Sequence, residues 1–179
     1  MQGIFRIRGK IKEVKIFKAK LESGEQITEA EWANIHIVAT LMKAFLRELP
    51  VPILLFENYT IFMKAAGKSE STWANGLVDF LSCKDLELEE AKKELQQMLE
   101  SLPSNNYSLM KFLFCLLHEL SENSETTQMN AENLAKVISP NLVWKEVLDI
   151  TDMSVVQDAM KGNIVAQLLI ENYCEIFSS

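Results

Sequence analysis

The fold class of this chain is decided by one stretch, which covers residues 106–121 and reads NYSLMKFLFCLLHELS. Apolar side chains lie on nearly every side of the helix that this stretch predicts. A helix that is apolar all round is buried among other elements. The stretch therefore predicts a central helix surrounded by others, and either Ser104 or Asn105 is expected to cap its start.

Helical patterns continue on both sides of this stretch. A capping box, Thr28 with Glu31, opens a helix that Pro50 ends near residue 49, and Asn130 caps one that Pro140 ends. Further helices are expected over residues 14–21, 52–66, 86–102 and 154–177, and a short helix between polar breaks is expected within residues 67–87, around Trp73, Leu77, Phe80 and Leu81. Strand periods, hairpin signatures and internal repeats are not found. The chain is expected to be a single-domain, all-α bundle of roughly eight helices over residues 1–179.

Length and composition are those of one globular domain. The chain has 179 residues, of which 48% are apolar, with only six glycines and four prolines. A chain of this length can bury a substantial core. No apolar run approaches the roughly 18 residues that a membrane span needs. Three widely spaced cysteines without a signal peptide suggest a reducing compartment, so a soluble, cytoplasmic protein is expected.

Charge is distributed unevenly along the chain. The net charge is −7, yet residues 1–20 carry seven basic side chains and one acidic one. A basic end of this kind is typical of a phosphate or nucleic-acid contact, or of a solvated tail. Only Phe5 and Phe17 accompany the cations, so single-strand stacking is poorly supported and no nucleic-acid partner is expected.

Motifs for catalysis by the chain itself are not found. The two histidines, His36 and His118, have no cysteine or carboxylate at metal-ligand spacing. The sequence contains neither a glycine-rich phosphate loop ending in Lys-Ser or Lys-Thr nor a nucleophile elbow. We expect a protein with no cofactor or metal of its own that is not itself an enzyme.

Two cations stand at the end of the helix that Pro50 terminates. Lys43 and Arg47 are four residues apart, so they lie on one face of that helix, one turn above the other. Cations are favoured at helix C-termini by the helix dipole, which is the simplest explanation of the pair. Alternatively, the two charges form a surface for an acidic partner.

Four segments, taken together and in order, resemble a known family. They are GIFRIRG at residues 3–9, the segment at residues 36–52 that includes KAFLRELPVP, LPSNNY at residues 102–107, and MNAENLA followed by SPNL within residues 129–142. These segments are similar to those of the RhoGAP family, the GTPase-activating domains for Rho-type GTPases. The match covers nearly all of the chain, and four ordered segments are far more specific than one.

The resemblance implies an all-helical module that completes the active site of a partner. That partner is a GTP-bound GTPase of the Rho, Rac or Cdc42 type, which itself holds the GTP and Mg²⁺. Arg6 matches the family's arginine finger, a guanidinium that stabilises the charge of the transferring phosphoryl group. In the finger loop, residues 3–9, the flanking Gly3 and Gly9 are expected to permit close approach to the nucleotide.

Five further positions match residues that the family places beside the finger. Lys43 and Arg47 are expected to support the finger loop and contact the GTPase, with Arg47 the more structural of the two. Asn133 matches a GTPase-contacting asparagine, although its amide could instead complete the helix cap at Asn130. Pro140 and Asn141 are expected to shape the turn beside the same surface.

Departures from the family pattern keep other functions open. Arg8 stands where the family usually has serine or proline, and Thr127-Gln128 replaces a usual Asn-Lys. The family's helix before the finger loop is not found in this sequence, so the loop is expected to be poorly pre-organised. The alternatives to a GTPase activator are a non-catalytic GTPase-binding module and a helical scaffold whose basic end contacts anionic lipid.

Overall fold

The computed structural model describes residues 2–73, 81–146 and 154–178, and all regular structure within these ranges is helical. Ten α-helices and one 3-10 turn make up the described part: α1 (Ile11–Ser23), α2 (Glu29–Trp32), α3 (Ile35–Glu48), α4 (Tyr59–Trp73), α5 (Leu81–Glu100), α6 (Ser104–Glu122), α7 (Ser124–Thr127), α8 (Ala131–Ile138), η1 (Ser139–Asn141), α9 (Ser154–Glu171) and α10 (Tyr173–Ile176). The expected all-α fold is confirmed. None of the described helices combines the length and the apolar content that a membrane span requires.

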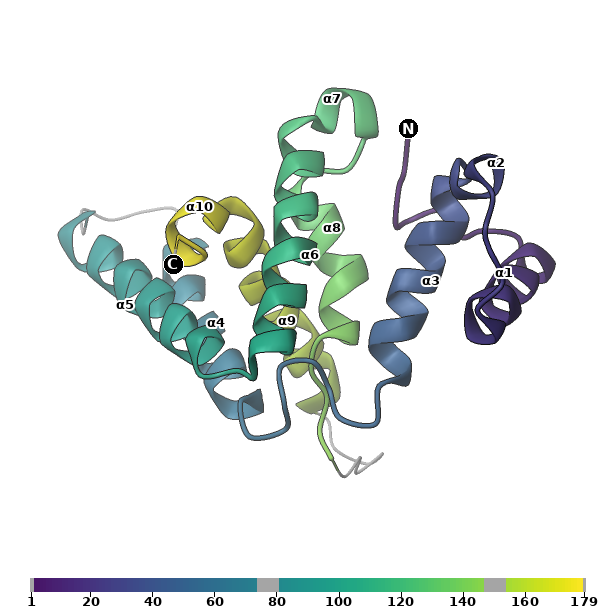
Figure 1. The fold of residues 1–179 in the computed structure, drawn as a ribbon. Coiled ribbons are helices and arrows are strands. Elements are labelled where there is room, and N and C mark those ends of the chain that lie inside the picture. Colours follow the sequence, from purple (N-terminus) through teal and green to yellow (C-terminus); the bar gives the residue numbers. More distant parts are fainter. Residues whose placement is uncertain (1, 74–80, 147–153, 179) are drawn as a thin grey trace.

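Two regions are visible in Figure 1. The first is the bundle, in which α4 packs against α5 and α9, and α8 and α6 pack against α9. The second, which we call the N-terminal unit, comprises the finger loop and α1–α3 (residues 2–48), and it lies on the right in the figure. Within it α1 packs on α3, and α3 meets the bundle beside η1.

Prolines end the helices where the sequence predicts. Leu49, which precedes Pro50, is extended with a ψ of 138°, so α3 stops at Glu48. The helix before Pro103 ends at Glu100. Pro140 likewise follows the end of α8 and falls in the short turn η1, which sets the direction of the chain beside α3.

The helix count differs from the expected eight because several predicted helices divide. The capping box at Thr28 is present, but α2 ends at Trp32, and Asn34 then accepts a bond from the Ile37 N–H to start α3. The predicted helix over residues 154–177 breaks at Asn172, whose side-chain amide donates to the Leu168 carbonyl (2.9 Å) and does not cap α10. The predicted helix over residues 67–87 was wrong in part, because Trp73 ends α4 and Leu81 begins α5; Leu77 and Phe80 lie outside the described residues.

Two expectations for the central helix also need correction. Its N-cap is Pro103, which has no side chain that could accept a hydrogen bond, rather than Ser104 or Asn105. One face of α6 is buried as predicted, through Met110, Leu113, Phe114, Leu117 and Leu120. Phe112 nevertheless lies 61% exposed on the opposite face, so the helix borders the bundle instead of being enclosed by it.

Candidate functional site

The finger loop is a hydrogen-bonded turn. The Gly3 carbonyl accepts bonds from the N–H groups of Arg6 (3.1 Å) and Ile7 (2.8 Å), while the Gly3 N–H donates to the Thr127 carbonyl (2.7 Å). Gly3 and Phe5 have φ of +68° and +66°, in the left-handed region. Glycine adopts that region without strain, whereas the backbone of a phenylalanine is strained there. The turn is therefore tied to the residue that ends α7.

Burial of its neighbours leaves Arg6 pointing outward. Ile4 and Phe5 belong to the hydrophobic core, with 7% and 2% of their surface exposed, and Arg6 directly after them is exposed. Two apolar side chains thus anchor the loop, and the side chain that follows them is exposed to solvent.

The second end of the finger loop is held by α3. The Gly9 N–H donates to the Thr40 hydroxyl (3.0 Å), and that hydroxyl donates to the His36 carbonyl (2.7 Å). A Cβ on Gly9 would lie 2.9 Å from the Ile37 Cα, so only glycine allows the loop this close to α3. The structure thus gives Gly9 a role within the protein. It also corrects the expectation of a poorly organised loop, because both ends are hydrogen-bonded.

Lys43 is the cation that holds the loop from α3. Its ammonium donates to the carbonyl of Phe5, the residue before Arg6. Burial, and then the neighbouring charges of Arg8 and Arg47, lower the pKa of Lys43 below its usual value. Arg47 is exposed, and no hydrogen bond or ion pair to it is found within the described part of the chain. The expectation that Arg47 is the more structural of the pair is therefore reversed.

A groove of about 600 Å³ joins these residues, and we call it the basic groove. It lies between the finger loop, α1 and α3, with one side closed by α8 and η1. Six cations line it, accompanied by one acid, Glu48: Arg6, Arg8, Lys15, Lys18, Lys43 and Arg47. Glu48 is bound by Lys18 at 2.5 Å. The groove therefore has a net positive field that suits an acidic or phosphate-bearing partner.

The three remaining predicted positions lie along α8 and η1. Asn141 lines the basic groove but is 93% buried, because its amide donates to the Val137 and Ile138 carbonyls (3.0 and 3.2 Å). Pro140 is exposed beside it. Asn133 is half-buried on α8, four residues before Val137, which lines the groove.

The cap of α8 leaves the Asn133 side chain uncommitted. The Asn130 side chain accepts from the Asn133 N–H at 2.9 Å, so the cap is made by Asn130 and not by the Asn133 amide. Among the described residues no hydrogen bond to the Asn133 amide is found. This side chain is thus available on the face of α8 that continues the groove.

Sequence reasoning missed two features of the site. Lys15 and Lys18 of α1 line the groove, and their three-residue spacing within the basic end is the signal that could have shown it. Thr127 was noted only as a departure from the family pattern. It is buried, its hydroxyl donates to the Leu120 carbonyl (3.1 Å), and its own carbonyl holds Gly3. A packing role of this kind has no signature in the sequence.

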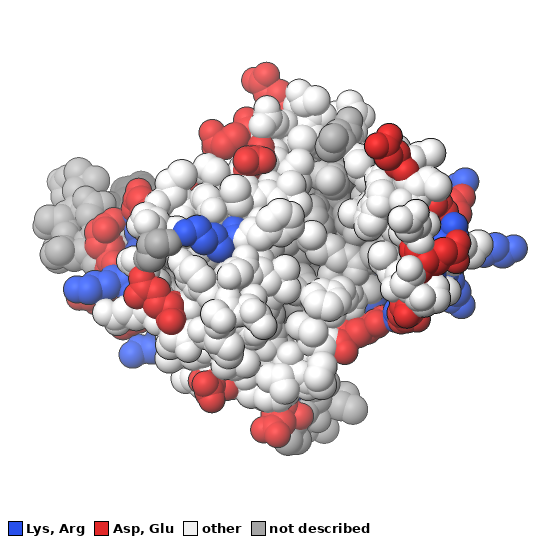
Figure 2. All heavy atoms as spheres, in the orientation of Figure 1, with Lys and Arg blue, Asp and Glu red and all other residues white. Residues whose placement is uncertain are grey.

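Figure 2 shows how charge is arranged on one face of the molecule. Lysine and arginine side chains lie at both ends of this face, over α1 on the right and over α5 on the left, with acidic side chains among them at each end. The middle of this face, over α6, is nearly free of charge. Four of the basic side chains within residues 1–20 come together in the basic groove: Arg6, Arg8, Lys15 and Lys18.

Comparison with known proteins gives one consistent result. A family model described as the RhoGAP domain matches residues 1–147. The chain is 32% identical over 178 residues to the Rho GTPase-activating protein gacY of Dictyostelium discoideum, covering 99% of this chain and 22% of that protein. It is 33% identical over 172 residues to the mouse (Mus musculus) Rho GTPase-activating protein 24, covering 94% of this chain and 20% of the relative. The chain thus spans about a fifth of the length of these relatives.

Two solved structures share the fold of this chain. The crystal structure of human Rho GTPase activating protein 15 superposes with a TM-score of 0.80 at 22% identity, covering 99% of this chain and 75% of that one. The BH domain from GRAF, the GTPase regulator associated with focal adhesion kinase, superposes with a TM-score of 0.76 at 28% identity, covering 99% and 85%.

Proposed function

Because the chain belongs to the RhoGAP domain family, we propose that it accelerates GTP hydrolysis by a Rho-type small GTPase, with Arg6 supplied in trans as the catalytic guanidinium. The observation that carries this proposal is the position of Arg6. It is the exposed residue at the edge of a basic groove, directly after two side chains that are fixed in the core.

The chemistry of GTP hydrolysis explains why an arginine serves here. Negative charge develops on the transferring phosphoryl group and the leaving oxygen, and a guanidinium stabilises it where water is excluded. An arginine supplied in this way accelerates hydrolysis by roughly 10³–10⁵, which corresponds to about 4–7 kcal/mol of barrier. Lysine carries the same charge but lacks the planar fork that can bridge two oxygens.

The residues in and beside the groove support this role in three ways. Lys43 fixes the carbonyl next to Arg6, which reduces the ordering that the loop must undergo when a partner binds. Arg8, Lys15 and Arg47 contribute a positive field that speeds encounter with an acidic surface. Asn133, Pro140 and Asn141 extend the contact surface along α8 and η1, with Asn141 acting through the shape of the turn.

The test is single-turnover GTP hydrolysis by Rho, Rac and Cdc42, each loaded with GTP and mixed with an excess of the protein. Arg6→Ala is expected to reduce the stimulated rate by about 10³ or more while changing binding of the GTPase less than tenfold. Arg6→Lys is expected to recover little of the rate, because the fork is lost. Lys64→Ala, which removes an exposed cation on α4 outside the groove, serves as the matched control.

Two outcomes would overturn the proposal in different ways. A stimulated rate that is equal in Arg6→Ala and the unmodified protein rules out Arg6 as the catalytic group. Tight GTPase binding without any acceleration by the unmodified protein assigns the chain to the alternative class, a non-catalytic binding module.

A further inference from the structure

The outward face of α1 combines cations with exposed isoleucines. Five exposed residues of this helix recur at helical spacing and make up this face: Ile11, Lys12, Lys15, Ile16 and Ala19. Ile11 is 74% exposed and Ile16 is 59% exposed, although isoleucine is among the residues most often buried. The opposite face carries Phe17, which is 4% exposed and packs edge-on against Trp32 at 5.2 Å. Packing of α1 on the protein therefore does not use the two isoleucines.

The cations of this face are free to meet an external anion. Within the described residues, Lys12 and Lys15 have no acidic partner. The two acids of α1 are each paired with a different lysine, Glu13 with Lys10 at 3.2 Å and Glu22 with Lys18 at 3.7 Å. The outward face consequently keeps its positive charge, in a protein whose net charge is −7.

We propose that the outward face of α1 binds an anionic lipid bilayer, with Ile11 and Ile16 entering the interface and Lys12 and Lys15 contacting the headgroups. Helices that lie in a membrane surface have this arrangement, with apolar side chains entering the acyl boundary and lysines on the flank. Lysines near an anionic leaflet each strengthen attachment, and this attraction falls as salt rises. A neutral or zwitterionic surface would give the isoleucines a similar apolar phase but would leave the lysines unpaired.

The acidic remainder of the protein orients this contact. Anionic headgroups repel the acidic surface while attracting the basic end, so α1 is the part that approaches the bilayer. Ile11 and Lys15 also line the basic groove, which opens beside this face. A bilayer contact through α1 therefore places the groove next to the membrane surface. This inference is independent of the proposed function, because it concerns binding to lipid without a GTPase.

The experiment is co-sedimentation of the unmodified protein with vesicles, in the absence of any GTPase. Phosphatidylcholine vesicles with about 30 mol% phosphatidylserine are compared with pure phosphatidylcholine vesicles, at low and at physiological salt. Binding is expected to the anionic vesicles alone and to weaken with salt. Lys12→Ser is expected to weaken binding by about fivefold and Ile16→Ser by about tenfold.

A control substitution distinguishes a specific lipid-binding site on α1 from a general effect of removing any exposed isoleucine. Ile61 is 41% exposed on α4, away from α1, and Ile61→Ser is expected to leave vesicle binding unchanged. Equal binding to both vesicle types, or equal losses in Ile16→Ser and Ile61→Ser, would overturn the proposal. So would a loss of GTPase stimulation in lipid-free solution for Ile16→Ser with vesicle binding intact, since that result assigns the face to a protein partner.

Discussion

The bundle and the N-terminal unit differ in how firmly they are packed. In the bundle α6 buries five side chains and α8 buries four of its eight residues. In the N-terminal unit α1 buries Phe17 alone and α2 buries no side chain. An open apolar groove of about 280 Å³ between α3 and α6, bordered also by Leu21 and Trp32, lies where the two regions meet. The six cations that line the basic groove thus all belong to the less buried region.

The finger loop, although part of the N-terminal unit, is also bonded to the bundle, and this explains how a thinly packed unit can hold the backbone of the loop in place. Ile4 and Phe5 are part of the core, and Gly3 is bonded to Thr127 at the end of α7. Gly9 and the Phe5 carbonyl are held by Thr40 and Lys43 of α3. The backbone on either side of Arg6 is therefore held by the bundle at Gly3 and by α3 at Phe5 and Gly9, while the Arg6 side chain itself is exposed.

The largest expected effect compares one phenylalanine from each region. Phe114 is fully buried and stacks on Phe177 at 5.8 Å, so Phe114→Ala is expected to cost about 3–5 kcal/mol of the free energy of unfolding. Phe17→Ala removes the same atoms from a site between two helices that can relax, and a cost of at most about half as much is expected.

Urea denaturation measures both losses, and native-state hydrogen exchange shows where they fall. Phe17→Ala is expected to speed exchange in α1 while leaving α6 protected, because α1 can open locally. If the two variants lose the same stability and exchange accelerates equally in both helices, the two regions unfold as one and the comparison fails.

A smaller effect is expected from a glycine that joins the finger loop to α3. In Gly9→Ala the new Cβ would meet the Ile37 Cα at 2.9 Å, and backbone atoms cannot move aside as a side chain can. Overpacking of this kind costs about 1–3 kcal/mol, and the displaced loop is expected to lower the GTPase-stimulated rate at least tenfold.

Gly24→Ala is the control for this substitution. Gly24 has φ +71° but no atom within 4 Å of its would-be Cβ, so it is strained without a clash. A stability loss of about 1 kcal/mol with an unchanged rate is expected. A full stimulated rate in Gly9→Ala would show that the approach to α3 does not position Arg6.

Local patterns predicted the bundle better than the N-terminal unit. Helix α8, with its Asn130 cap and the proline after it, follows from sequence because cap, apolar period and terminator agree. The break between α2 and α3 could not be predicted from the sequence, since the apolar period continues across it. There Trp32 turns back to pack on Phe17, a contact between helices that no local rule contains.

The site likewise contains residues that the sequence could identify and contacts that only the folded structure reveals. The family resemblance selected Arg6, Lys43, Arg47 and Asn141, and the structure brings all four to the basic groove. Lys15 joins them only because α1 packs on α3. The anchoring of Gly3 by Thr127 links two segments far apart in the sequence, and hydrogen bonds of this kind are set by the fold.

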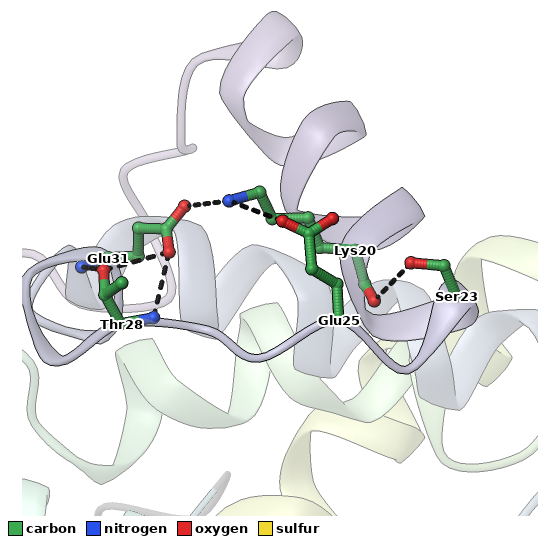
Figure 3. Close-up of polar contacts among 5 residues, drawn as sticks. All are labelled: Lys20, Ser23, Glu25, Thr28 and Glu31. Carbon is green, nitrogen blue, oxygen red and sulfur yellow. Dashed lines mark hydrogen bonds and ion pairs between the residues drawn. The ribbon is translucent and has the colours of Figure 1, made fainter.

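The smallest expected effect lies in the capping box, where the N-terminal unit is held by ionic contacts (Figure 3). The Glu31 carboxylate accepts from the Lys20 ammonium at 2.7 Å and from the N–H and hydroxyl of Thr28 at 2.9 and 3.0 Å. The Lys20 contact, followed by the two Thr28 bonds, lowers the pKa of Glu31 to about 2. A carboxyl whose pKa is lower in the folded state than in the unfolded state stabilises the fold at pH values above the unfolded-state pKa. This stability is lost as the pH falls through the folded-state pKa. The contribution is small because both side chains are partly exposed.

Titration of the Glu31 carboxyl carbon by NMR tests this contact directly. At about pH 3.5 the carboxyl is expected to be still ionised, roughly a unit below the usual glutamate midpoint. In Lys20→Met its midpoint is expected to move back toward 4.5, the ordinary value, because the largest cause of the shift is removed. Glu29→Gln, which removes a nearby acid of α2 that does not contact Lys20 in the described structure, is expected to leave the Glu31 midpoint in place. A Glu31 midpoint that is the same with and without Lys20 would mean that α1 and α2 are joined by apolar packing alone.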